Sequence, residues 1–140
     1  MSDPKKARIL IIDDDVNFRD MLRIHLSAAG YAPQVAEDAI EGGKALLSNP
    51  PDLIISDLNM PYMDGFELLG LMQAEKETAS IPVIFLSGRS DGDTMARAVE
   101  LGAADFITKP VTRDQLLASI KSCLAKGGRA GSASPAQTPA

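Results

Sequence analysis

Short apolar runs that recur along the chain constrain its fold more than any other feature of the sequence. They lie at residues 9–12, 53–55, 83–86 and 106–107, with a weaker candidate at residues 32–36. The clear runs are continuous and do not alternate with polar residues, which is typical of strands buried on both faces. Five such strands predict a parallel sheet with helices on each side, a doubly wound (βα)5 architecture.

Segments with a helical period separate these runs. Phe18, Leu22 and Leu26 recur at four-residue spacing, and Phe66 and Leu69 follow a turn at Asp64-Gly65. Further helices are expected at residues 39–47, 91–101 and 112–125. Glycines stand where helices should stop (Gly30, Gly102 and Gly127), and Thr112 is expected to cap the last helix at its N-terminus.

The chain length and the charge balance limit the organisation and the partners. One core is expected for 140 residues, so residues 1–126 are predicted to form one domain, and the Gly/Ala/Ser/Pro-rich residues 127–140 a flexible tail or linker. The 14 basic and 19 acidic residues give a net charge of −5, which argues against direct nucleic-acid binding. A single cysteine, no apolar stretch of membrane-spanning length and no signal-peptide pattern lead us to expect a cytoplasmic protein without a membrane partner.

Polar residues follow directly on four of the predicted strands. Asp13, Asp14 and Asp15 end the first run, Asp57 follows the third, Ser87 the fourth, and Lys109 the fifth. Ligands of such sheets bind beyond the carboxyl ends of the strands, so these side chains should converge at one edge. A charged group there needs a cation or a partner, and grouped carboxylates suit Mg²⁺ together with a phosphate. The lysine would then supply a positive charge for a phosphoryl oxygen, and the serine a hydrogen bond.

At this point the sequence resembles the receiver domain of two-component response regulators, over about residues 7–125. The resemblance rests on four blocks in order: Ile11-Ile12-Asp13-Asp14-Asp15; Asp57-Leu58-Asn59-Met60-Pro61 with Asp64-Gly65; Phe85-Leu86-Ser87-Gly88; and Gly102-Ala103-Ala104-Asp105-Phe106-Ile107-Thr108-Lys109-Pro110. It implies a flavodoxin-like sheet with the strand order 2-1-3-4-5.

The resemblance also implies the role of each site residue. Asp57 would accept a phosphoryl group from a phosphohistidine on a histidine kinase or a phosphotransfer protein. Asp13, Asp14, Asp57 and the backbone carbonyl of Asn59 would hold Mg²⁺, or Mn²⁺ in its place. Lys109 would pair with one phosphoryl oxygen, and Ser87 would hydrogen-bond another.

A switch of the protein surface is implied as well. In the family, movement of the hydroxyl that corresponds to Ser87 is coupled to an aromatic residue on the fifth strand, here Phe106. Their coupling reshapes the face made by the fourth helix, the fifth strand and the fifth helix, which would control a downstream protein target or effector domain, or a phosphorylation-dependent homodimer. Phe106 lacks the hydroxyl of a tyrosine, and simple core packing is its alternative role. The Lys109-Pro110 bond corresponds to a position that is often cis in the family.

Several residues have a structural explanation that competes with a functional one. Asp15 is interpreted as a helix N-cap and not a metal ligand. His25, alone on the first helix, is interpreted as a packed or solvated imidazole, and Cys123 as a structural thiol. Arg89 and Asn59 border the site, where they could tune water access and the phosphate lifetime, an alternative that the sequence leaves open.

Two other functional classes share part of the pattern. A phosphatase of the haloacid dehalogenase type also uses a strand-end aspartate with Mg²⁺, but such enzymes resemble Asp-x-Asp, and the third position here is Asn59. A flavodoxin-like electron carrier needs hydrogen-bond donors where this chain has an acidic first loop. We therefore expect a phosphoprotein of phosphorelay signal transduction, either a stand-alone regulator or the receiver of a longer chain, that catalyses only its own phosphorylation and dephosphorylation.

Overall fold

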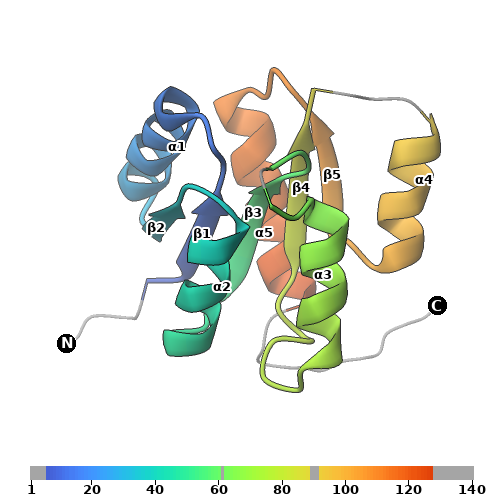
Figure 1. Cartoon of the computed structure of the whole chain (residues 1–140). Coiled ribbons are helices and arrows are strands. Elements are labelled where there is room, and N and C mark those ends of the chain that lie inside the picture. The colour runs from blue at the N-terminus through green and yellow to red at the C-terminus, as the bar shows by residue number, and fades with distance from the viewer. Residues whose placement is uncertain (1–5, 61, 89–91, 128–140) are drawn as a thin grey trace.

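Five parallel strands form one sheet in the order β2-β1-β3-β4-β5, as the sequence and the resemblance predicted (Figure 1). The computed structural model describes residues 6–60, 62–88 and 92–127. The strands are β1 (Arg8–Ile12), β2 (Ala32–Ala36), β3 (Leu53–Asp57), β4 (Val83–Ser87) and β5 (Asp105–Thr108). The helices are α1 (Val16–Ala28), α2 (Ala39–Ser48), α3 (Gly65–Ala74), α4 (Gly92–Leu101) and α5 (Arg113–Gly127).

The helices cover both faces of the sheet, so each central strand is buried on both of its faces. Leu10 and Ile12 of β1 pack with residues of α2, α3 and α4 in one core cluster. Ile9 and Ile11 of the same strand point the other way and pack with residues of α1 and α5 in a second cluster. Figure 1 shows this division, with α2 and α3 in front of the strands and α5 behind them. The continuous apolar runs therefore reflect two cores that share one sheet.

Short polar side chains and glycines set the helix ends. Asp15, Asp38 and Asp64 cap α1, α2 and α3 through their carboxylates, and Asp64 forms a reciprocal capping box with Glu67. The Thr112 hydroxyl accepts a hydrogen bond from the Gln115 N–H at 3.0 Å, which confirms the predicted cap of α5. Gly30 and Gly102 follow α1 and α4 with φ angles of +96° and +95°, a conformation that favours glycine.

The predicted elements are all present within the described residues, with small shifts at their ends. Strands β3 and β4 each include the polar residue at their carboxyl end, Asp57 and Ser87. The predicted start of the fourth helix at Asp91 lies outside the described residues, and α4 is described from Gly92. Helix α5 continues to Gly127, and residues 128–140 of the predicted tail lie outside the described part of the chain. None of the described helices has the length and hydropathy needed to cross a membrane.

Candidate functional site

Three carboxylates meet at the carboxyl edge of the sheet. One oxygen from each of Asp13, Asp14 and Asp57 can be chosen so that all three lie within 4.8 Å of one another. Their proximity follows from the strand register, because β1 and β3 are neighbours and Ile12 pairs with Ser56. Asp13 directly follows β1 and Asp57 ends β3, each one residue beyond this pair, so the sheet brings together acids that are 44 positions apart in the sequence.

Asp13 is the most deeply buried of the three acids, with only 1% of its surface exposed. Its Oδ1 accepts a hydrogen bond from the Asp15 N–H at 2.9 Å, and its Oδ2 lies 3.2 Å from the Lys109 ammonium nitrogen. The Arg19 guanidinium donates to the Asp13 carbonyl oxygen at 2.7 Å. These contacts compensate the burial of a charge and fix the loop between β1 and α1.

Lys109 reaches the acidic cluster from the end of β5. Its Nζ lies 3.2 Å from Asp13 Oδ2 and 3.9 Å from Asp57 Oδ2. The Lys109 N–H donates to the Ser87 carbonyl oxygen at 2.7 Å, so pairing with the end of β4 directs the side chain toward the cluster. The Lys109-Pro110 peptide bond is cis, as it often is at the corresponding position of the family that the sequence resembles.

The environment of Asp57 disfavours its negative charge. Burial is the largest cause that raises the pKa of Asp57 above its ordinary value, and Asp13 and Asp14 add to it. Lys109 and a hydrogen bond from the Asn59 N–H, at 3.4 Å from Asp57 Oδ1, partly oppose this rise in the pKa. Among the described residues, the Lys109 ammonium pairs with two of the three carboxylates of the cluster, Asp13 and Asp57. A divalent cation would neutralise charge that this one ammonium does not.

The donor set suits a hard divalent cation. Carboxylate oxygens are ligands that Mg²⁺ prefers, and Mg²⁺ keeps several waters of its own. Asp14 is exposed while Asp13 is buried, so the cluster opens to solvent on one side. The residues present therefore fit a magnesium site.

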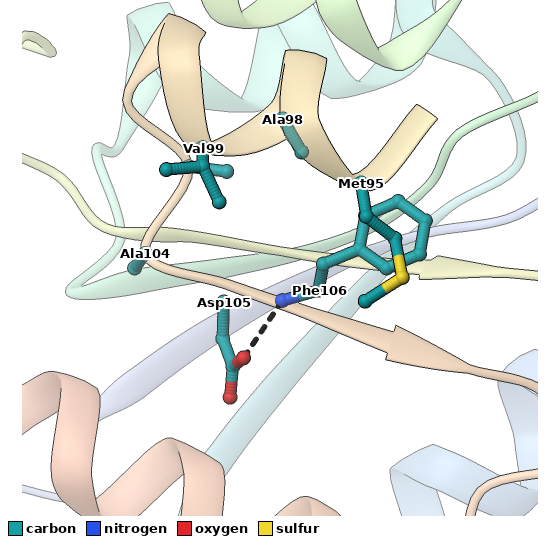
Figure 2. Close-up of a pocket in the computed structure, with 7 residues that line it drawn as sticks. Met95, Ala98, Val99, Ala104, Asp105 and Phe106 are labelled. Atoms are coloured by element: carbon teal, nitrogen blue, oxygen red, sulfur yellow. Dashed lines mark hydrogen bonds between the residues drawn. The ribbon is translucent and has the colours of Figure 1, made fainter. Parts of the chain in front are cut away.

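Ser87 and Phe106 lie on neighbouring strands near this edge. Ser87 is fully buried at the end of β4, one residue beyond the Leu86 that pairs with Asp57. Phe106 on β5 is half-buried and lines a cavity of about 180 Å³ between α4 and β5. Figure 2 shows its ring beside Met95 of α4, with Ala98 and Val99 further along the same helix. Phe106 thus has free volume next to it and packs against the core at the same time.

Two contacts at the site are not predicted by the sequence pattern. The apolar period of the first helix includes Phe18 only as a core residue, yet the Lys109 Nζ lies 4.4 Å from its ring centroid. No sequence signal marks Arg19, yet it binds the carbonyl oxygen of Asp13. The helical period could not reveal either contact, because it reports which way a side chain faces on the helix. The Phe18 contact depends on where the start of α1 lies relative to the end of β5, and the Arg19 contact depends on the loop between β1 and α1. Arg89, expected to border the site, lies outside the described residues.

Asp15, His25 and Cys123 lie in positions that agree with the structural roles expected from the sequence. The Asp15 carboxylate accepts hydrogen bonds from the N–H groups of Asn17 and Phe18, so it caps α1 as predicted. His25 is partly buried in the last turns of α1. Cys123 is buried in the core between the sheet and α5, and burial raises the pKa of its thiol. A buried thiol with a raised pKa is a poor nucleophile, as expected of a structural cysteine.

Comparison with known proteins settles the family. Residues 9–121 match the family described as the response regulator receiver domain. The chain belongs to this family. The receiver is therefore a signalling domain with a phosphoacceptor role in two-component systems, and Mg²⁺ binding at an acidic pocket is a standard feature of its family. Among the functional classes that share part of the sequence pattern, the family match supports the receiver.

Curated relatives and solved structures agree with this assignment. The receiver is 37% identical over 122 residues to a DNA-binding dual master transcriptional regulator, RpaA, of Synechocystis sp., covering 87% of this chain and 51% of that protein. It is 34% identical to the phosphate regulon transcriptional regulatory protein PhoB of Pseudomonas aeruginosa, covering 91% of this chain and 56% of that protein. The chain thus spans about half the length of the curated relatives it matches.

Solved receiver structures superpose along most of the chain. The chemotaxis response regulator CheY4 of Vibrio cholerae gives a TM-score of 0.81 at 28% identity, covering 86% of this chain and all of that one. The receiver domain of a signal transduction histidine kinase from Syntrophus aciditrophicus gives 0.81 at 35% identity, covering 94% of this chain and 99% of that one. Receivers of this fold therefore occur both in response regulators and in histidine kinases.

Proposed function

We propose that Asp57 is the phosphoacceptor of this receiver. The observation that carries the proposal is the position of its carboxylate, which lies at the end of β3 within the acidic cluster and 3.9 Å from the Lys109 ammonium. In the transfer, a carboxylate oxygen of Asp57 attacks the phosphorus of a phosphohistidine on a histidine kinase or phosphotransfer protein. A P–O bond forms, the P–N bond breaks, and the imidazole nitrogen leaves with the electron pair and takes up a proton.

The remaining site residues would position and neutralise the phosphoryl group. Asp13, Asp14, Asp57 and the backbone carbonyl of Asn59 would hold Mg²⁺ or Mn²⁺, which when bound neutralises charge on the transferring phosphoryl group. Lys109, already paired with Asp13 and Asp57, would move its ammonium to a phosphoryl oxygen. Ser87 would donate its hydroxyl hydrogen to another phosphoryl oxygen.

The output of phosphorylation is proposed to be a change of the surface formed by α4, β5 and α5. Phe106 is suited to couple the site to that surface, because it lies on β5 near Ser87 and lines the cavity against α4. Phosphorylation can shift Phe106 between two packings only by the difference in interaction free energy between them. The partner at this surface would be a downstream protein, an effector domain or a second phosphorylated receiver.

The wider organisation belongs to the same proposal. Residues 1–126 would form the receiver and residues 127–140 a linker or tail. The chain would act in the cytoplasm without direct contact to nucleic acid or membrane, as a stand-alone regulator or as the receiver of a longer protein. It would catalyse only its own phosphorylation and dephosphorylation and would not turn over external phosphate esters.

Intact mass spectrometry tests the phosphoacceptor directly. The native chain and the Asp57→Asn variant are incubated with acetyl phosphate and Mg²⁺, with and without a chelator. We expect one added phosphoryl group on the native chain, lost in the variant and lost when Mg²⁺ is removed. Asp52→Asn is the matched control, because Asp52 directly precedes β3 at the end opposite Asp57 and its substitution should leave labelling unchanged. Labelling that persists in Asp57→Asn would refute the assignment.

A further inference from the structure

Phe18 places an aromatic ring directly against the Lys109 ammonium. It is the third residue of α1, and its N–H donates to the Asp15 cap at 3.2 Å. Its side chain packs against the core cluster that lies between the sheet, α1 and α5. The helix and the core therefore fix the position of the ring independently of Lys109. The Lys109 Nζ lies 4.4 Å from the ring centroid.

Within the described part of the chain, two carboxylates and one aromatic ring lie against the Lys109 Nζ. Asp13 Oδ2 lies at 3.2 Å, Asp57 Oδ2 at 3.9 Å, and the Phe18 ring covers a further side. The face of an aromatic ring carries partial negative charge and attracts a cation, which an aliphatic side chain of similar size does not. The Lys109 side chain is still 26% exposed, so without the ring it could turn toward water.

We propose that Phe18 is a positioning residue for phosphoryl transfer, which holds the Lys109 ammonium beside Asp57. This inference rests on the proposed function of Asp57. The ring and the acids Asp13 and Asp14 belong to one continuous segment, which the Asp15 cap ties to α1. The same segment thus fixes both the acidic cluster and the position of the lysine that would meet the phosphoryl oxygen.

Proton NMR of the magnesium-free protein tests the contact without any reaction. Because the ammonium lies over the ring face, the ring current should shift the Lys109 ε-methylene protons upfield of ordinary lysine values. Phe18→Leu should abolish this shift, and Phe18→Tyr, which keeps the ring, should retain it. Phe66→Leu is the matched control, because Phe66 stacks with the Arg97 guanidinium at 4.9 Å and not with Lys109. An ordinary chemical shift for Lys109 in the native protein would overturn the proposal.

Phosphorylation kinetics test the consequence. With saturating acetyl phosphate and Mg²⁺, Phe18→Leu should lower the rate constant of Asp57 labelling by about two- to fivefold, the factor that corresponds to a partly exposed cation–π contact. Phe18→Tyr should restore the rate constant, and Phe66→Leu should leave it unchanged. Equal rate constants for the native chain and Phe18→Leu would overturn the positioning role alone. A native chain that is not labelled on Asp57 would instead refute the proposed function.

Discussion

Gly65 lies so close to Phe85 that no larger side chain fits between them. A Cβ at Gly65 would lie 2.7 Å from the Phe85 Cε1 and 3.2 Å from the Asp57 carbonyl oxygen. The Gly65 N–H also donates to the Leu58 carbonyl oxygen at 2.8 Å. The N-terminus of α3 is therefore packed directly on the end of β3, which fixes one end of the segment that carries Asn59.

Gly65→Ala should destabilise the receiver because the added methyl group must displace the Phe85 ring or the backbone. Overpacking of this kind costs about 1–3 kcal/mol. Gly70→Ala on the same helix is the matched control, since nothing lies within 4 Å of a Cβ there and alanine favours a helix over glycine by about 1 kcal/mol. Urea unfolding should thus show opposite signs for the two variants. Equal stability of Gly65→Ala and the native protein would contradict the close packing.

Asp57→Asn should make the magnesium-free receiver more stable at neutral pH. Burial raises the pKa of the Asp57 carboxyl, so the folded state binds its proton more tightly than the unfolded state does. The resulting loss of folding stability is fully present when the pH is above the pKa of Asp57 in the folded state. It disappears as the pH falls through that pKa toward 3.8, the ordinary pKa of an aspartate. The stability difference between variant and native protein should therefore shrink on acidification. Urea unfolding between pH 7 and pH 4 measures it, and a constant or growing difference would contradict the prediction.

Magnesium should stabilise the native receiver more than it stabilises Asp57→Asn. A ligand that binds only the folded state adds about 1.4 kcal/mol at a free concentration ten times its dissociation constant. The native receiver should gain this stability on titration with Mg²⁺, while Asp57→Asn should gain less, because it offers a neutral amide in place of a carboxylate. Asp20→Asn, an exposed position on α1, should respond like the native protein. Thermal unfolding with and without a chelator measures the gain, and an equal gain in Asp57→Asn would argue against a metal site that includes Asp57.

Lys109→Met should destabilise the receiver and slow its phosphorylation. It removes the ammonium 3.2 Å from Asp13 Oδ2, so this buried carboxylate loses its ion pair and keeps the hydrogen bond from the Asp15 N–H. A buried charge that loses its hydrogen-bonding partner costs about 1–3 kcal/mol or more, and Lys109 is partly exposed, so we expect the lower part of that range. Lys121→Met replaces an exposed lysine on α5 and is the control for the loss of a lysine side chain. Urea unfolding and the mass assay should separate the two variants, and identical behaviour would show that the Lys109 pair contributes nothing.

The sequence alone determined the (βα)5 pattern and most of the site residues. Continuous apolar runs that alternate with helical segments are typical of strands in a parallel sheet. Their positions therefore predicted the sheet and, at its carboxyl edge, Asp13, Asp57, Ser87 and Lys109. Local chemistry also predicted the Asp15 and Thr112 caps, because a cap depends on atoms within three residues. The strand order came from the resemblance, since periodicity carries no information about which strands are neighbours.

Only the tertiary structure decided which residues contact one another around the Lys109 ammonium. Phe18 and Lys109 are 91 positions apart, and Asp13 and Lys109 are separated by 96. Their contacts depend on the register of β1, β3, β4 and β5 and on the angle at which α1 leaves the sheet. The helical period predicts that an apolar side chain such as Phe18 faces the core. It does not predict which residues of other elements that side chain contacts. The ring that covers the Lys109 ammonium is therefore visible only when the strand ends and the start of α1 are placed together.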